Sequence, residues 1–219
     1  MKKWTDRIET PIQAELICYD VNGIQIVFGV TEEKQLKMFH FSSAPFDAEN
    51  LCRKPDGMFP EEGMREAQIK ESFQLVQVNF SGYNRPYEKH GNKYIVTAPG
   101  FMLKFDSISE ERNENGDVLR IVQKDTVTGA KVESVMQFFD GIPVARMYNT
   151  VTNEGKEDQT LEYISSFSYW GIEKEHKAGI PEFVSSDDKM SMVVVHNGWQ
   201  KELTVKKYRF ADLGMAQTQ

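Results

Sequence analysis

The side chains best suited to acid–base chemistry in this sequence are its histidines, because imidazole is the group that titrates closest to neutral pH. There are four of them: His40, His90, His176 and His196. A reaction that opens and recloses a sugar hemiacetal uses a general acid and a general base, usually a His and a Glu. None of the four histidines lies in a recognisable motif. Such an activity would therefore require two of them and a Glu to converge in one concave pocket.

Aromatic side chains form a second group that could contact a ligand. An indole or phenol ring can pack on the C–H face of a pyranose while its polar atom bonds a hydroxyl. Trp170, Tyr83 and Tyr87 could form such a platform, provided that their rings are exposed. Cys18 and Cys52 lie far apart and lack CxxC spacing, so we expect neither a disulfide nor a metal site. No motif indicates a cofactor.

The charge of the chain limits its partners. It has 219 residues and a formal net charge of −7, whereas binding to phosphates needs clustered Lys and Arg. We therefore expect neither a nucleic-acid nor a membrane partner. The N-terminal sequence MKKWTDRIETP lacks the apolar run of a signal peptide, which favours a cytoplasmic protein with reduced thiols. One small basic cluster is expected to be the solvated side of a strand: Lys201, Lys206, Lys207 and Arg209.

The stretch that organises the chain is Asp125 to Trp170, which predicts three consecutive β-strands joined by two short turns. Alternate residues of the first strand should face a core, because successive side chains of a strand point to opposite faces; they are Val132, Ser134, Met136 and Phe138. The turns are Asp140-Gly141 and Asn153-Glu154-Gly155, and turns this short join antiparallel neighbours. On the third strand one face should carry Leu161, Tyr163, Phe167 and Tyr169.

The rest of the chain also alternates, so the sequence predicts an all-β protein. Asn22-Gly23 between Ile12–Tyr19 and Ile24–Val30 is a strong hairpin signal. Ser42–Glu66 is expected to be a long loop, and Glu110–Asp117 a charged hairpin tip. Further strands are expected at Gln35–Phe41, Gln68–Phe80, Lys93–Ala98, Phe101–Ser107, Val118–Lys124, Met190–His196 and Leu203–Phe210. About a dozen strands exceed one twisted sheet, so we expect a single domain, residues 1–219, of two stacked antiparallel sheets.

Between Leu16 and Gly214 the chain resembles the N-terminal domain of the bacterial α-galactosidases of glycoside hydrolase family 36. That family has an Asp and a Gly before a strand, an Arg in the next, then Asn-x-Gly, Leu-Glu and a Ser. The matching residues here are Asp125, Gly129, Arg146, Asn153, Gly155, Leu161, Glu162 and Ser166. Gly198-Trp199-Gln200-Lys201-Glu202 is similar to the family's Gly-x-Trp-x-x-Glu, and Leu213-Gly214 to its short tail.

The resemblance implies a fold and a role. The fold is a large antiparallel β-supersandwich, galactose mutarotase-like, which in the family precedes a catalytic (β/α)8 barrel. That barrel carries the two Asp residues that cleave the sugar, and no barrel motif is present here. We therefore expect a non-catalytic domain with no catalytic residue of its own. Its expected partners are the barrel of a parent enzyme, a galactoside-type carbohydrate and further copies in a homo-oligomer.

The resemblance also implies substrate-binding residues. The Trp of the family's motif corresponds to Trp199 and would contact the sugar. An acidic residue from the long loop is a second contributor, for which Asp47 and Asp56 are the candidates, although neither can be matched one to one. Arg65 and Glu202 are expected to form a buried structural pair.

Two alternatives stay open. One is a stand-alone enzyme of the mutarotase or aldose-epimerase type, which would need the converging histidines described above. The other is a lectin-like carbohydrate-binding module, which would need exposed aromatic rings.

Overall fold

The computed structural model describes residues 1–8, 13–48, 73–83, 98–169 and 191–209, to which all that follows refers. The chain divides into two compact units, Met1–Ile172 and Glu173–Gln219, each of which is described by itself. Its regular structure is almost entirely β, in antiparallel sheets, which confirms the predicted fold class. That the chain forms one domain stays a prediction.

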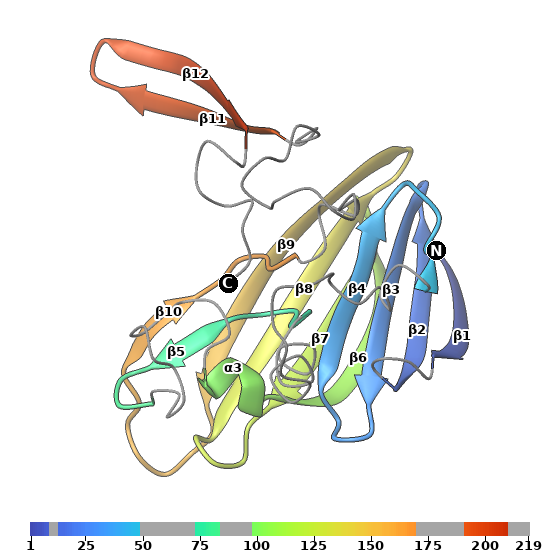
Figure 1. Ribbon diagram of the computed structural model, residues 1–219, viewed down its shortest axis with the longest axis vertical. Coiled ribbons are helices and arrows are strands. Elements are labelled where there is room, and N and C mark those ends of the chain that lie inside the picture. Colours follow the sequence, from blue (N-terminus) through green and yellow to red (C-terminus); the bar gives the residue numbers. More distant parts are fainter. Residues whose placement is uncertain (9–12, 49–72, 84–97, 170–190, 210–219) are drawn as a thin grey trace, which may run out of the picture. The chain divides into compact units, whose positions relative to one another are not determined.

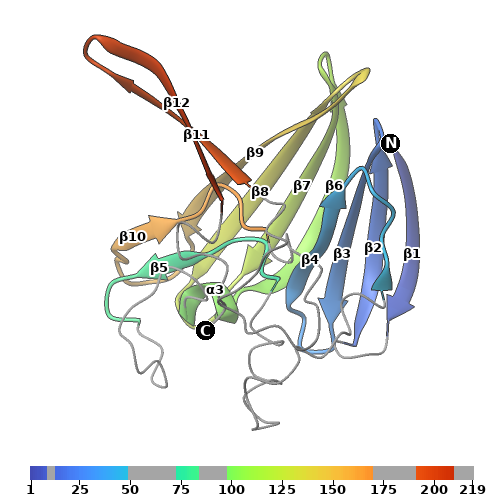
Figure 2. The same cartoon turned by 45° about the horizontal axis from the view of Figure 1, so that its top comes forward.

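The first sheet of the larger unit is a meander of four strands in sequence order (Figures 1 and 2). The strands are β1 (Lys2–Ile8), β2 (Ala14–Val21), β3 (Ile24–Thr31) and β4 (Leu36–Ser42). Asn22 and Gly23 have φ angles of 52° and 81°, the positive values that a tight two-residue hairpin turn requires. The hairpin predicted there is therefore confirmed. The sequence pattern did not predict β1, which pairs with β2 from Lys2↔Asp20 to Ile8↔Ala14.

The second sheet is also a four-stranded meander. Its strands are β6 (Lys104–Asn113), β7 (Gly116–Lys124), β8 (Ala130–Phe139) and β9 (Ile142–Asn153). The predicted hairpin tip at Glu110–Asp117 is confirmed in place but is shorter than expected, because β6 and β7 stay paired up to Asn113↔Gly116 and only Glu114 and Asn115 form the turn. Charged side chains do not interrupt these strands because they pair across them: Arg120 contacts Glu111 at 2.9 Å, and Arg112 contacts Asp117 at 3.0 Å.

Two shorter strands, β5 (Val78–Phe80) and β10 (Leu161–Ile164), form a separate ribbon. The sequence predicted that the third strand of the central stretch would pair with β9, and this is wrong. β10 pairs with β5 instead, because Glu162 accepts hydrogen bonds from Asn79 Nδ2 (2.8 Å) and Ser81 Oγ (2.7 Å). A turn's length cannot reveal contacts made with a segment eighty residues earlier.

Three further strand predictions are corrected in their extent. β10 ends at Ile164, so Phe167 and Tyr169 lie beyond it rather than on its face. Within the described part of the expected strand Gln68–Phe80, only the last three residues are strand. Ala98–Met102 is a short helix, α3, so the strand expected from Phe101 begins at Lys104. Among the described residues, no helix has the length and apolar run that a bilayer crossing requires.

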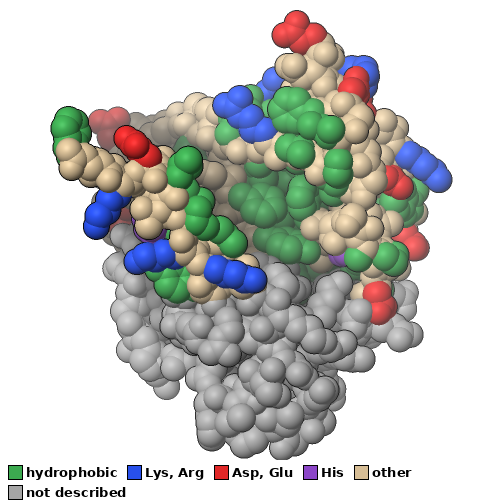
Figure 3. Space-filling model, turned by 90° about the horizontal axis from the view of Figure 1, so that it is seen from above, with side chains coloured by type: hydrophobic (Ala, Val, Ile, Leu, Met, Phe, Trp, Pro, Cys, Tyr) green, Lys and Arg blue, Asp and Glu red, His purple; other side chains and the backbone are tan. Residues whose placement is uncertain are grey.

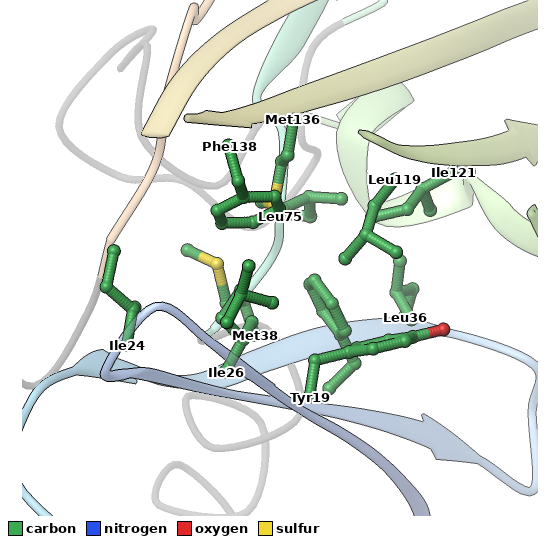
Figure 4. Packing of buried hydrophobic residues seen from close by; sticks show 12 residues of the cluster. Tyr19, Ile24, Ile26, Leu36, Met38, Leu75, Leu119, Ile121, Met136 and Phe138 are labelled. Atoms are coloured by element: carbon green, nitrogen blue, oxygen red, sulfur yellow. The ribbon is translucent and has the colours of Figure 1, made fainter. Parts of the chain in front are cut away.

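The core of the larger unit lies between the two four-stranded sheets (Figure 4). Tyr19, Ile26, Leu36 and Met38 of the first sheet meet Leu119, Ile121, Met136 and Phe138 of the second, and Leu75 joins them. The predicted inner face of β8 is confirmed, since each of its four alternate residues is fully buried: Val132, Ser134, Met136 and Phe138. Each large apolar side chain buried in this way contributes roughly 1.5–3 kcal/mol. Burial of this face therefore holds the sandwich together.

The smaller unit contributes one described hairpin, of β11 (Ser191–Gly198) and β12 (Lys201–Arg209). The two strands pair from Ser191↔Arg209 to His196↔Thr204, shift register, and end at Gly198↔Lys201. Both strands were predicted, and Trp199 and Gln200 form the turn that joins them.

Candidate functional site

Trp199 occupies the apex of the β11–β12 hairpin. The register shift after His196 leaves Trp199 and Gln200 as the two turn residues, and Gln200 has a φ of 61°. The Leu203 N–H donates to Asn197 Oδ1 at 2.9 Å, which fixes the base of the turn. Trp199 is 93% exposed. The hairpin therefore presents an entire indole ring to solvent, with both ring faces and the N–H free to meet a ligand.

The body of the hairpin carries apolar and basic side chains together (Figure 3). Val195 and Val205 are direct cross-strand partners, and Val193 lies on the same face. They are 49%, 61% and 56% exposed, and Leu203 is 72% exposed. Lys201, Lys206 and Lys207 are also exposed, as predicted for the basic cluster. The sequence pattern did not predict that this apolar face would be uncovered, because alternation does not say what packs on a strand.

Glu202 follows the turn on β12 and is exposed. The sequence predicted that it would form a buried pair with Arg65. The prediction of burial is wrong for Glu202, which lies on a two-stranded ribbon. Arg65 lies outside the described residues.

Four of the eight motif residues between Asp125 and Ser166 form a junction of two loops in the larger unit: Asp125, Gly129, Asn153 and Gly155. Asp125 is 4% exposed. Its carboxylate accepts bonds from the Val127 N–H (2.9 Å), the Thr128 N–H (3.1 Å) and the Thr128 hydroxyl (2.6 Å). Gly129 has a φ of +76°, and a Cβ added there would lie 2.4 Å from the Cα of Gly155. Only a glycine fits where the two loops touch.

The second loop of this junction is held in the same manner. Asn153 accepts the Gly155 N–H at Oδ1 (2.9 Å) and donates from Nδ2 to the Glu157 carbonyl (2.8 Å). The Glu154 N–H donates to the Gly129 carbonyl at 2.8 Å, which ties the second loop to the first. The conformation of each loop thus depends on the other. These motif residues have a structural role, because their polar atoms are engaged with the backbone.

The remaining motif residues are spread over the larger unit. Glu162 binds β10 to β5, and the Ser166 carbonyl accepts the Asn149 Nδ2 at 3.3 Å. Arg146 is exposed on β9, with its guanidinium 5.9 Å from the ring centroid of Tyr148. The structure therefore does not gather these three into a site.

The substrate role expected of the two aspartates stays a prediction. Asp47 is exposed near the end of a described segment of the larger unit. Asp56 lies outside the described residues.

The two histidines that the structure describes belong to different units, so neither unit shows a pair of histidines. His40 is 1% exposed, and its Nε2 lies 2.7 Å from the Ala44 carbonyl oxygen, an acceptor that holds Nε2 as a donor. His196 is exposed on β11. His90 and His176 lie outside the described residues. The described contacts of His40 thus indicate a structural histidine.

Of the three rings of the expected aromatic platform, the structure describes only Tyr83. Tyr83 is half-buried and packs on the cluster that includes Val76, Val78 and Phe80. Tyr87 and Trp170 lie outside the described residues. Sequence analysis missed a different aromatic group: Phe167, 42% exposed, lies 5.5 Å from Phe41 and 6.1 Å from Tyr169, measured between ring centroids.

Within the described segments, no three His, Cys, Asp or Glu side chains gather as metal ligands would. No family model matches the chain, and no curated protein matches it.

Among the predicted site residues that the structure describes, Trp199 is the one whose exposure suits the expected contact with a sugar.

Proposed function

We propose that this chain is the N-terminal, non-catalytic domain of an α-galactosidase-like glycoside hydrolase. In this proposal it packs on a catalytic (β/α)8 barrel, and its hairpin presents Trp199 to a galactoside bound there. The proposed fold is the galactose mutarotase-like supersandwich. One observation carries the proposal, namely the 93% exposure of Trp199 at the apex of a hairpin.

Exposure matters because a structural Trp beside a turn would be expected to bury its ring. Trp is highly buried on average, and its large ring contributes most when it is removed from water. A ring held in solvent at the end of a rigid turn is placed to be covered by something else. The C–H face of a pyranose suits an indole face, and the indole N–H can donate to a sugar hydroxyl.

The family's motif supports the proposal from a second direction. Asp125, Gly129, Asn153 and Gly155 are separated by up to thirty positions, yet they meet at one loop junction. The resemblance therefore follows a set of mutually dependent contacts, and the motif specifies a local fold. The all-β architecture agrees with the fold that the resemblance implies.

The proposal assigns the cleavage chemistry to the barrel. Retaining hydrolysis needs two carboxylates about 5–5.5 Å apart on either side of the glycosidic bond. Asp125 and Glu162, the carboxylates in the matching motif, accept hydrogen bonds that hold loops and strands together.

We place the domain in the cytoplasm, where the free, buried thiol of Cys18 would stay reduced.

The test is an assay with an aryl α-galactoside, first on this chain alone and then on the chain together with a family 36 type catalytic barrel. The chain alone should release no aryl alcohol, and the assembled protein should. Turnover by the chain alone would contradict the non-catalytic role. A failure of the chain to bind the barrel, measured by sedimentation, would contradict the docking role.

A lectin-like module is the second candidate, and the same exposed Trp199 favours it. In that case the chain alone would bind galactosides through the hairpin apex. Titration of the isolated chain with methyl α-galactoside, followed by isothermal calorimetry, separates the two. Saturable binding that is lost in Trp199→Ala supports the module, whereas no binding without the barrel supports the domain.

A further inference from the structure

The longest described strand, β9, lies at an edge of its sheet (Figure 1). It has twelve residues, and in the described part of the chain it pairs along one side only, with β8. An edge strand exposes a row of N–H and C=O groups that can pair with another strand. The other side of β9 is therefore a template for strand addition.

The side chains of β9 do little to protect this edge. Native edges are commonly blocked by Lys, by Pro, by bulges or by inward-pointing charges. Between Ile142 and Asn153 the only charged residue is Arg146. The only proline, Pro143, lies in a bulge at the beginning of the strand, where the pairing with β8 jumps from Phe138↔Ala145 to Phe139↔Ile142. Beyond this bulge the strand offers a regular, nearly uncharged edge from Ala145 to Asn153, with Tyr148 43% exposed on its outer face.

We propose that β9 of one copy of this chain pairs antiparallel with β9 of a second copy. The β6–β9 sheets of the two copies would then join into one continuous sheet across a two-fold axis. This inference does not depend on the proposed function, because it uses only the strand edge and its side chains.

The charge on the strand selects the register. A two-fold axis through Arg146 would place the two guanidinium groups opposite each other, and like charges directly opposite are destabilising. An axis through Met147 places each Arg146 opposite Tyr148 of the other copy, where a cation over a ring is favourable. The Arg146 guanidinium lies 5.9 Å from its own Tyr148 ring centroid, so the two groups share one face of the strand, and this register brings the Tyr148 of the second copy to the same face. The second axis is therefore the one that we assign.

The same register pairs the regular part of the strand with itself. Ala145 lies opposite Asn149 of the other copy, and Met147 lies opposite its own counterpart. The regular overlap runs from Ala145 to Asn149 in both copies and ends at the bulge of each strand, where Val144 approaches Thr150 of the other copy as an apolar and β-branched pair. This fit between β9 and itself is why a second copy, rather than an unrelated strand, is the assigned occupant.

Sedimentation velocity of the whole chain over a concentration series tests the proposal. We expect a reversible monomer–dimer equilibrium. Tyr148→Lys places a lysine opposite Arg146 of the other copy twice in each dimer and should raise the dissociation constant about tenfold or more. The matched control is Val193→Lys on the hairpin, at an apolar residue that is 56% exposed against 43% for Tyr148; it should leave the constant unchanged.

Two outcomes would overturn the proposal. One is a wild-type chain that stays monomeric at all concentrations. The other is a dimer that is dissociated by Val193→Lys but not by Tyr148→Lys. Circular dichroism of both variants checks that they fold.

Cysteine cross-linking tests the register independently. In a Cys52→Ser background, Met147→Cys should form an intermolecular disulfide under mild oxidation, because the two positions meet at the axis. Thr152→Cys should not, because it lies opposite position 142 of the other copy. Cross-linking at 152 without cross-linking at 147 would overturn the assigned register.

Discussion

The inner face of β8 and the β11–β12 hairpin share the same alternating sequence pattern, but their side chains lie in opposite environments. Val132, Met136 and Phe138 are fully buried, whereas Val193, Val195 and Val205 are 56%, 49% and 61% exposed. A period of two predicts that a segment forms a strand with an apolar face. It does not predict what covers that face. The difference matters for function, because a two-stranded hairpin is marginal by itself and gains stability from whatever packs on it.

Truncating one residue in each region tests most directly whether the two regions differ in packing. Phe138→Ala removes a fully buried ring and should lower the free energy of unfolding by about 3–5 kcal/mol. Val195→Ala on the hairpin should change it by less than about 0.5 kcal/mol. Urea unfolding followed by circular dichroism measures both. Equal losses at the two positions would show that the hairpin is as firmly packed as the sandwich.

A second prediction concerns the loop junction of the sandwich, which the hairpin lacks. Gly129→Ala both forces an alanine into the left-handed region and drives its Cβ into Gly155, so we expect a loss of roughly 3 kcal/mol. Gly141→Ala is the matched control: it has the same φ of +76°, but no atom lies within 4 Å of the added Cβ. It should cost only about 1 kcal/mol. Similar unfolding midpoints for the two variants would contradict the role given to this junction.

Thiol reactivity sharpens the same comparison. Burial, with a smaller effect from Asp6, raises the pKa of the Cys18 thiol to about 11. In a Cys52→Ser background, Cys18 should therefore react with iodoacetamide at pH 8 on the order of a hundredfold more slowly than a cysteine introduced by Val195→Cys. Mass spectrometry over time gives both rates.

The raised pKa of Cys18 also makes the contribution of this thiol to stability depend on pH. Because the folded pKa is raised, the stabilising contribution of Cys18 is fully present below pH 9 and is lost as the pH rises through about 11. Rapid labelling of Cys18 at pH 8 would mean that the first sheet opens readily.

The smallest expected effect is that of Trp199 on stability. Since the ring is 93% exposed, Trp199→Ala should change the free energy of unfolding by less than about 0.5 kcal/mol. A large loss in urea unfolding would mean that the ring is buried in solution, and the ligand role would then fail.

The sequence predicted those elements whose determinants are local. The Asn22-Gly23 turn and the alternation of β8 need only neighbouring residues, and both were found as predicted. β1 was missed because its exposed, charged sequence forms a strand only by pairing with β2. The partner of β10 was wrong because Asn79 and Ser81, far away in the chain, select it.

The candidate site follows the same rule. Trp199 was identified because it lies in a contiguous motif. Its place at the apex depends on a register shift in the hairpin, and its exposure on what does not cover it. Neither property is encoded in the spacing of the motif.

The most direct test of the central claim is the Michaelis constant for an aryl α-galactoside, measured on this chain assembled with a family 36 type catalytic barrel. Trp199→Ala should raise the constant about tenfold, which is the loss of one stacking contact of about 1.4 kcal/mol. Val127→Ala, at a residue of the sandwich that is 69% exposed, should leave the constant unchanged. A Trp199→Ala enzyme with the wild-type Michaelis constant would contradict the claim that the hairpin brings Trp199 to the sugar.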